Sequence, residues 1–254
     1  MGSRTGFIVK GILLSVMLTG LVSCGASNAQ RKDESGIHFR LGVVHLNERN
    51  LAEALKELTT AVEMYPEEPS YHNALGLAYF AKGMNSDAIR EMKKAISIDP
   101  KFSEAHVNLS AVYMVERRWD DVVSESKEAL KNIFYRTPEF AHFNMGWAYF
   151  NRGDYALALQ SYKKAAEDNP NYAPAYYQLG LTHEKLSNVR EAIEAYEMAV
   201  KTSPGFTDAH FSLGLLRVKQ KDKAGALKAF EKVVEIAPGS EKAQSAKEYI
   251  KLIK

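Results

Sequence analysis

A glycine follows a leucine or methionine five times at a near-constant spacing, at Leu41-Gly42, Leu75-Gly76, Met145-Gly146, Leu179-Gly180 and Leu213-Gly214. Leu109-Ser110 fills the one gap in this series, so the period is 34 residues, and 36 once. A constant period of this length indicates an array of similar small structural repeats. Such repeats stack on their neighbours to bury a continuous core, and they usually bind partners rather than catalyse reactions.

Two further sets of residues keep the same register. With each repeat counted from seven residues before its glycine, the twentieth position holds Val122 in the third repeat and otherwise alanine, at Ala54, Ala88, Ala158, Ala192 and Ala226. Proline closes the repeat at Pro66, Pro100, Pro170, Pro204 and Pro238. Glycine and alanine let two helices cross closely, and proline lacks the N–H group that would continue the second helix. Each repeat is therefore predicted to be a helix-turn-helix.

Helix-forming residues and capping residues support this prediction. Strong helix formers fill residues 51–64 and 154–168. Where second helices should begin, the chain has side chains that can accept hydrogen bonds from free backbone N–H groups, at Asn50, Asp154, Asn188 and Asp222.

This pattern resembles the tetratricopeptide repeat. The resemblance covers six consecutive repeats, residues 35–68, 69–102, 103–138, 139–172, 173–206 and 207–240. It implies an all-α fold, a right-handed superhelical solenoid. The third repeat departs most, with Ser110 for glycine, Val122 for alanine, and two additional residues near 133–137 before Pro138. We therefore expect its second helix to end differently.

Residues 1–23 are predicted to be a signal peptide, because Arg4 and Lys10 precede an apolar run, residues 11–22, that is too short for an ordinary transmembrane helix. Leu21-Val22-Ser23-Cys24 resembles the lipobox of bacterial lipoproteins, which are cut before the cysteine that carries the lipid. The alternative is a signal peptide with an incidental, unmodified cysteine. Because Cys24 is the only cysteine, no internal disulfide forms.

Residues 24–34 are expected to form the lipidated cysteine and a flexible tether, because residues 25–34 are small and polar. In lipoproteins of many bacteria with two membranes, aspartate after the cysteine favours inner-membrane retention, and this chain has Gly25. The resemblance therefore implies a lipid anchor at the periplasmic face of the outer membrane.

Residues 241–254 are predicted to be a capping helix over the last repeat, since Ala243, Ala246, Ile250 and Ile253 form one apolar stripe. The formal net charge is +2. The sequence has no basic stripe with interleaved aromatic residues, so nothing in it indicates nucleic-acid binding. We expect a monomer.

Repeats, signal peptide, tether and cap leave no stretch long enough for a catalytic domain, and no phosphate loop, nucleophile elbow or metal motif is present. We expect neither an enzyme nor a cofactor. Five histidines share the fourth position of a repeat, at His38, His72, His106, His142 and His210, and two share the eleventh, at His45 and His183. Stacked helices lie about 8–10 Å apart, whereas zinc holds ring nitrogens at about 2.0–2.1 Å. We therefore expect these histidines to pack between repeats.

In the family that this chain resembles, the first helix of each repeat lines a concave surface. Relatives that clamp a terminal carboxylate use asparagine and lysine there, and the ninth positions here contain neither, which disfavours such a clamp. Contiguous exposed apolar surface usually marks a binding site. The groove that we predict is apolar, with Asn108, Asn144 and Gln178 able to hold the backbone of a bound segment, and it comprises Val43, Leu46, Leu77, Phe80, Val107, Asn108, Met114, Phe143, Asn144, Trp147, Phe150, Tyr177 and Leu181.

An extended or helical apolar segment of another protein would fit this surface, with Trp147, Phe143, Phe150, Phe80 and Met114 as anchors. The alternative is that the aromatic residues of the fifth and twelfth positions only pack between neighbouring repeats.

Together, the lipobox, the six repeats and the insertion Phe134-Tyr135-Arg136-Thr137-Pro138-Glu139 resemble the type IV pilus biogenesis lipoproteins, the pilotins. The resemblance implies a scaffold that escorts secretin subunits to the outer membrane and promotes their assembly into a ring. Two other interpretations stay open, a periplasmic scaffold for cell-wall hydrolases or synthases and a component of an exopolysaccharide export machine.

Overall fold

The computed structural model describes residues 28–254, so the signal peptide and Cys24 lie outside the described residues. In this part of the chain the regular secondary structure is entirely helical. The first helix is described over residues 28–47. It is followed by α2 (Leu51–Met64), α3 (Pro69–Ala81), α4 (Asn85–Ile98), α5 (Ser103–Val115), α6 (Trp119–Leu130), α7 (Pro138–Arg152), α8 (Tyr155–Asp168), α9 (Ala173–Lys185), α10 (Val189–Thr202), α11 (Thr207–Lys219), α12 (Lys223–Ile236) and α13 (Glu241–Ile253).

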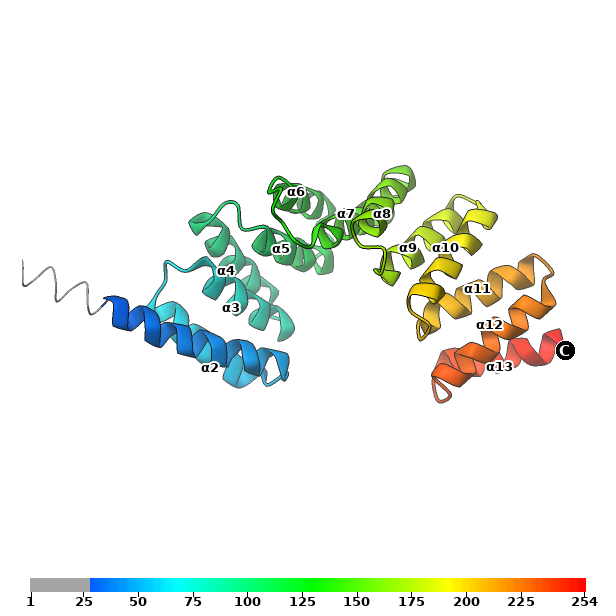
Figure 1. The fold of residues 1–254 in the computed structure, drawn as a ribbon, viewed down its shortest axis with the longest axis horizontal. Coiled ribbons are helices and arrows are strands. Elements are labelled where there is room, and N and C mark those ends of the chain that lie inside the picture. Colours follow the sequence, from blue (N-terminus) through cyan, green and yellow to red (C-terminus); the bar gives the residue numbers. More distant parts are fainter. Residues whose placement is uncertain (1–27) are drawn as a thin grey trace, which may run out of the picture. The chain divides into compact units, whose positions relative to one another are not determined.

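The helices form two compact segments, an N-terminal segment that ends at Asn108 and a C-terminal segment from Leu109 to Lys254. In the N-terminal segment α3 packs against α2 and α4. In the C-terminal segment each helix from α6 to α13 packs against the next one, and α11 also contacts α13 (Figure 1). This arrangement confirms the predicted all-α solenoid of helix pairs.

The glycines make room for one large side chain each. A methyl group added at Gly146 would lie 2.6 Å from a ring carbon of Tyr162, sixteen residues later, and one at Gly214 would lie 2.7 Å from the ring of Phe230. Leu58, Met92 and Tyr196 fill the same place below Gly42, Gly76 and Gly180. In the third repeat both positions hold small buried residues, Ser110 and, sixteen residues later, Ser126. The loss of the glycine thus coincides with a smaller residue at the second position.

The prolines and the capping helix lie as predicted. The helices α2, α4, α8, α10 and α12 each end two residues before the proline of their repeat. The residue before each proline is kept out of helical geometry by the proline ring, as at Asp99 with ψ 97° and Asn169 with ψ 94°. In α13, Ala243 and Ala246 are fully buried against Phe230 and Val233 of α12. This helix covers the core of the last repeat.

The second helix of the third repeat ends differently from the others, as expected, but Pro138 does not have the position predicted for it. Helix α6 stops at Leu130, and its cap Lys131 is still in right-handed helical geometry. Pro138 does not close α6 but occupies the first turn of α7. Proline is favoured there because its missing N–H would have no partner in the first turn.

Two local expectations were wrong. Asn50, Asp154, Asn188 and Asp222 all precede second helices, but only the side chain of Asp222 accepts a backbone hydrogen bond, from Gly225. Residues 28–34, expected in the flexible tether, belong to the first helix. There Gln30 donates to Glu34 at 2.9 Å, one helical turn later, and Lys32 lies over the ring of Tyr65. These residues are exposed, so pairing along the helix and the contact of Lys32 with Tyr65 accompany helix formation despite the polar composition.

A left-handed residue stands at the same position in all six turns between first and second helices. It is glycine twice, at Gly83 and Gly153, and a residue with a side chain four times, at Arg49, Arg117, Ser187 and Lys221, where φ lies between 56° and 60°. The stacking of the two helices thus imposes a backbone geometry that these four residue types do not favour.

Candidate functional site

Six residues of the predicted groove lie in the N-terminal segment, and each is half-buried or buried. Val43 and Leu46 pack from the first helix onto a core that includes Leu58 and Leu75. Leu77 and Phe80 are half-buried on α3, and Asn108 is half-buried on α5. Val107 is only 8% exposed. Five of these side chains are partly buried and Val107 is buried, so this part of the predicted groove offers partly exposed, mainly apolar surface.

The other seven residues lie in the C-terminal segment. Met114 on α5, Phe143, Trp147 and Phe150 on α7, and Tyr177 and Leu181 on α9 are half-buried, and Asn144 is 8% exposed. The ring of Phe143 lies 5.4 Å from that of Tyr172 and 5.6 Å from that of Tyr162. Tyr177 repeats this pattern in the next repeat, 5.0 Å from Phe206 and 5.6 Å from Tyr196. Phe143 and Tyr177 therefore stabilise their own repeats.

Trp147 is different, because it stands at a ninth position with a single aromatic neighbour. Its ring centre lies 6.2 Å from that of Phe143 and the side chain is half-buried. A partly exposed tryptophan that packs on another aromatic ring can bury much additional surface on binding, with little loss of conformational entropy. Trp147 is therefore the strongest binding candidate of the predicted set.

The predicted backbone-binding amides already join successive first helices. The Nδ2 group of Asn108 donates to Oδ1 of Asn73 at 3.1 Å, and that of Asn144 donates to the hydroxyl of Ser110 at 2.8 Å. Gln178 is 7% exposed. The expectation that these three side chains hold a partner is corrected for Asn144, which is buried and bonded to a neighbouring repeat.

Two buried tyrosines below this face differ in their hydroxyl partners. The hydroxyl of Tyr196 donates to Oε1 of Glu184 at 2.6 Å. The hydroxyl of Tyr162 is buried without a hydrogen-bond partner among the described residues, because Phe150 takes the repeat position of Glu184. Burial raises the pKa of both phenols, and the Glu184 carboxylate raises that of Tyr196 further. Both therefore act as neutral hydroxyl groups.

The insertion of the third repeat exposes two apolar side chains that the prediction did not include. Ile133 is 86% exposed and Phe134 is 83% exposed in the loop between α6 and α7. The Asn132 side chain accepts a hydrogen bond from the backbone N–H of Phe134 at 3.0 Å and fixes the turn. Exposed neighbouring apolar side chains favour contact with a partner. The sequence signal was available, since this loop is where the repeat length changes.

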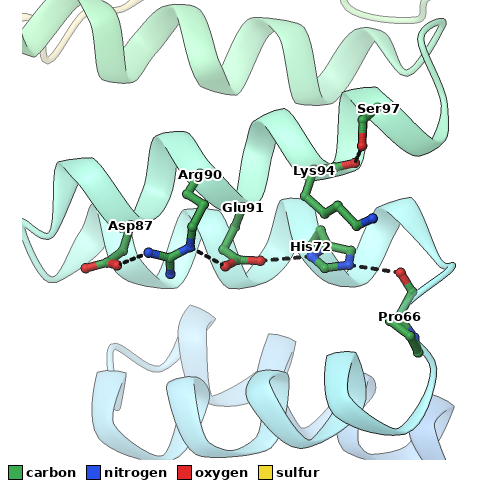
Figure 2. A network of polar contacts seen from close by, with 7 residues as sticks. All are labelled: Pro66, His72, Asp87, Arg90, Glu91, Lys94 and Ser97. Atoms are coloured by element: carbon green, nitrogen blue, oxygen red, sulfur yellow. Dashed lines mark hydrogen bonds and ion pairs between the residues drawn. The ribbon is translucent and has the colours of Figure 1, made fainter.

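Three fourth-position histidines, His72, His106 and His210, bond the preceding repeat, as expected of packing residues, whereas His38 and His142 pair with acids of their own repeats. In α3, His72 Nε2 donates to the Pro66 carbonyl at 3.0 Å and Nδ1 contacts Oε2 of Glu91 on α4 at 2.8 Å (Figure 2). The hydrogen bond with His72 and that with Arg90 lower the pKa of Glu91, against the opposing effect of burial. His38 pairs with Glu57 at 2.6 Å in the same way. We call a fourth-position histidine paired with the carboxylate nineteen residues later the histidine clasp.

Within residues 28–254 no helix is both long and apolar enough to cross a bilayer, and no cluster of three metal-ligating side chains forms. What the described surface offers is apolar contact area on a rigid helical frame.

The sequence matches descriptions of known repeats over most of the array. The tetratricopeptide repeat profile matches residues 39–120 and 177–241, more than half of the chain, and a second TPR repeat profile matches residues 141–187. A search of curated proteins found no match.

Solved structures with the same fold include two that correspond to nearly the whole array. PilF of Pseudomonas aeruginosa is 18% identical with a TM-score of 0.76, and the match covers 87% of this chain and 99% of PilF. PilW, a widely conserved type IV pilus biogenesis factor, is 19% identical with a TM-score of 0.76 over 84% of this chain and 98% of PilW. YrrB, a TPR protein with an unusual peptide-binding site, is 21% identical with a TM-score of 0.56 over 75% of this chain and 97% of YrrB.

Proposed function

Because the chain belongs to the tetratricopeptide repeat family, which is generally a non-catalytic scaffold for protein interactions, we propose that it is a lipid-anchored scaffold for secretin assembly. In this proposal it acts at the outer membrane, where it promotes localisation and assembly of the secretin through which a type IV pilus passes.

The observation that carries the proposal is the extent of the structural likeness. PilF and PilW are each covered almost completely at a TM-score of 0.76, whereas YrrB, of the same repeat type, reaches 0.56. Coverage of nearly the whole of both proteins supports a role like that of a type IV pilus biogenesis factor.

The proposed secretin-binding surface is the half-buried aromatic face of the C-terminal segment, centred on Trp147. Phe143 and Phe150 flank this residue on α7, and Leu181 on α9 adds apolar area. Hydrophobic side chains packed on a rigid base are typical of the few residues that dominate an interface. We propose that an apolar segment of the secretin subunit docks here.

The proposed anchor is the lipid on Cys24. Each buried methylene of an acyl chain contributes about 0.8 kcal/mol, so the several chains of a bacterial lipoprotein hold a protein stably on a membrane. The scaffold would then capture its partner at the membrane where the ring assembles.

The first test compares outer membranes from cells with and without this gene, on a gel that separates secretin multimers from monomers. The proposal expects multimers to disappear while monomers persist. Normal multimers together with intact pili would refute it and favour the cell-wall scaffold, for which dimers of the mature chain in solution would be further support.

A second test locates the surface. Trp147→Ala should weaken secretin binding by about 1 to 4 kcal/mol without loss of helicity. Leu252→Ala is a matched control, since Leu252 is 82% exposed on the capping helix. Equal affinities of the wild type and both variants would place the secretin-binding surface elsewhere.

A further inference from the structure

In the second repeat, the imidazole ring of the histidine clasp makes two contacts. In the second repeat, Nε2 of His72 bonds the carbonyl of Pro66, which closes the preceding repeat, and Nδ1 lies 2.8 Å from Glu91 (Figure 2). Both nitrogens face acceptors, which the protonated ring satisfies with two N–H groups. Glu91 thus supplies, from within the chain, the carboxylate that contacts Nδ1 of His72.

The sixth repeat keeps the histidine but lacks the carboxylate. His210 Nε2 donates to the carbonyl of Pro204 at 2.9 Å, so the ring has the same orientation as that of His72. Nineteen residues after His210 the chain has Ala229, where the second repeat has Glu91. No residue from 28 to 254 bonds Nδ1 of His210. The sixth repeat therefore has the histidine and its bond to the proline carbonyl but lacks the carboxylate of the histidine clasp.

A cavity occupies the place of the missing carboxylate. Its volume is about 520 Å³, and His210, Pro204, Gly225 and Ala229 are among the residues that line it. Ala229 and Gly225 lie on the same face of α12; the small Ala229 leaves space toward α10 and α11, and the Arg217 side chain of α11 lies over Gly225. The cavity is far larger than one carboxylate, so a side chain from another molecule can enter.

Among the charged residues around the cavity, Lys228 is the one cation that the described residues leave without an ion pair. Arg217 is paired with Glu197 at 2.5 Å, Lys232 with Glu235 at 2.6 Å, and Glu231 with Lys254 at 3.8 Å. Lys228 also lines the cavity and forms no ion pair within the described residues. The three acids that face the cavity therefore already have partners, whereas Lys228 and the Nδ1 atom of His210 have none.

From this arrangement we propose that the cavity between α10, α11 and α12 binds an acidic side chain of a partner protein, whose carboxylate contacts His210 Nδ1 as Glu91 contacts His72. The cavity is lined from the second helices α10 and α12 as well as α11, and it shares no residue with the aromatic face around Trp147. The proposal thus stands independently of secretin binding.

Proton uptake accompanies this contact. In the empty cavity, burial lowers the pKa of His210 below its ordinary value, and Lys232 adds to this while the Pro204 carbonyl and Glu235 oppose it. An incoming carboxylate stabilises the protonated ring of His210. The other charged residues that line the cavity are Arg217, Lys228, Glu197 and Glu231.

Restoring the clasp inside the chain is the first test. Ala229→Glu places a carboxylate at the position of Glu57 and Glu91, and it should raise both the midpoint of thermal unfolding and the pKa of His210 measured by NMR. Ala195→Glu is the control, because it adds the same charge at the same position of the fifth repeat, whose fourth position holds Tyr176 in place of histidine. Equal effects of both substitutions would overturn the assignment.

The second test titrates the purified full-length protein, in detergent, with the peptide acetyl-Ala-Ala-Glu-Ala-Ala-amide near pH 6.5. The imidazole signal of His210, assigned by its loss in His210→Gln, should move toward the protonated position with a Kd of about 1 mM, typical of a single contact. The glutamine version of the peptide should bind at least about tenfold more weakly, and Ala229→Glu should abolish the shift. An unmoved signal, or equal shifts with both peptides, would overturn the proposal.

Discussion

The two tyrosines below the aromatic face should respond in opposite ways to the loss of one oxygen atom. Tyr162→Phe and Tyr196→Phe remove a hydroxyl from rings that are both fully buried, so ring packing is retained in each case. The two hydroxyls differ in their partners: Tyr196 bonds Glu184 at 2.6 Å, and Tyr162 has no partner in the described chain. The comparison therefore isolates the hydrogen bond.

The magnitude follows from these contacts. A hydrogen bond to a charged group contributes about 1.5 to 3 kcal/mol. The Glu184 side chain is 29% exposed and has Lys219 at 3.8 Å. In the variant, water and Lys219 therefore partly replace the hydrogen bond that Glu184 loses. We expect Tyr196→Phe to lower the free energy of unfolding by about 1 to 2 kcal/mol. An unpaired buried hydroxyl is itself unfavourable, so Tyr162→Phe should be neutral or stabilise by up to about 1 kcal/mol.

Urea unfolding followed by circular dichroism measures both values, and amide hydrogen exchange in α8 and α10 shows where each effect lies. Exchange is the decisive readout, because a repeat array can unfold in parts. Destabilisation of equal size in both variants would refute the reasoning, since it would mean that the Tyr162 hydroxyl also has a partner.

Three further perturbations test other parts of the structure. Gly146→Ala should cost about 1 to 3 kcal/mol through overpacking on the ring beneath it, whereas Gly36→Ala, whose added carbon has ordinary contacts at 3.5 Å, should be neutral or stabilising; thermal unfolding of both compares them. Glu57 and Glu91 have pKa values lowered chiefly by their hydrogen bonds with histidine, so their stabilisation is present above the unfolded value of 4.5 and is lost as pH falls through the folded values. Urea titrations from neutral pH to about pH 3 should therefore show a loss of stability that is smaller in Glu91→Gln, and a pH dependence identical to the wild type would contradict this. Replacing Ile133 and Phe134 by serine should leave stability unchanged within about 0.5 kcal/mol, because both are exposed; weaker binding of secretin would make the loop part of the interface, and a large loss of stability would show that the loop packs on the fold.

Much of the fold could be predicted from the sequence because it depends on local chemistry repeated six times. In five of the six repeats, glycine at the helix crossing and alanine at the twentieth position leave room for close helix packing, and proline ends the second helix. Helix α2 spans the predicted residues 51–64, and the second helices stop where proline requires. The histidines at the fourth position were also identified as packing residues from the repeat spacing alone.

The candidate site was predictable only in part, because exposure depends on neighbours that are distant in sequence. Apolar residues were predicted to line a groove, but Phe143 and Tyr177 pack against aromatic rings of their own repeats. Asn144 was predicted to face a ligand, and it bonds Ser110 thirty-four residues earlier. Ile133 and Phe134 were not predicted as binding residues, since only the structure shows how the inserted turn exposes them.

The sequence by itself determined the period, the helix pairs and the class of protein, because each follows from residue types at fixed spacing. The tertiary structure alone decided which side chains have partners. It bonds Asn144 to Ser110, leaves the Tyr162 hydroxyl buried without a partner among residues 28–254, and opens a cavity beside His210 where Ala229 replaces an acid. The physical reason is that complementarity is a property of two residues brought together by packing, and neither residue type specifies it alone.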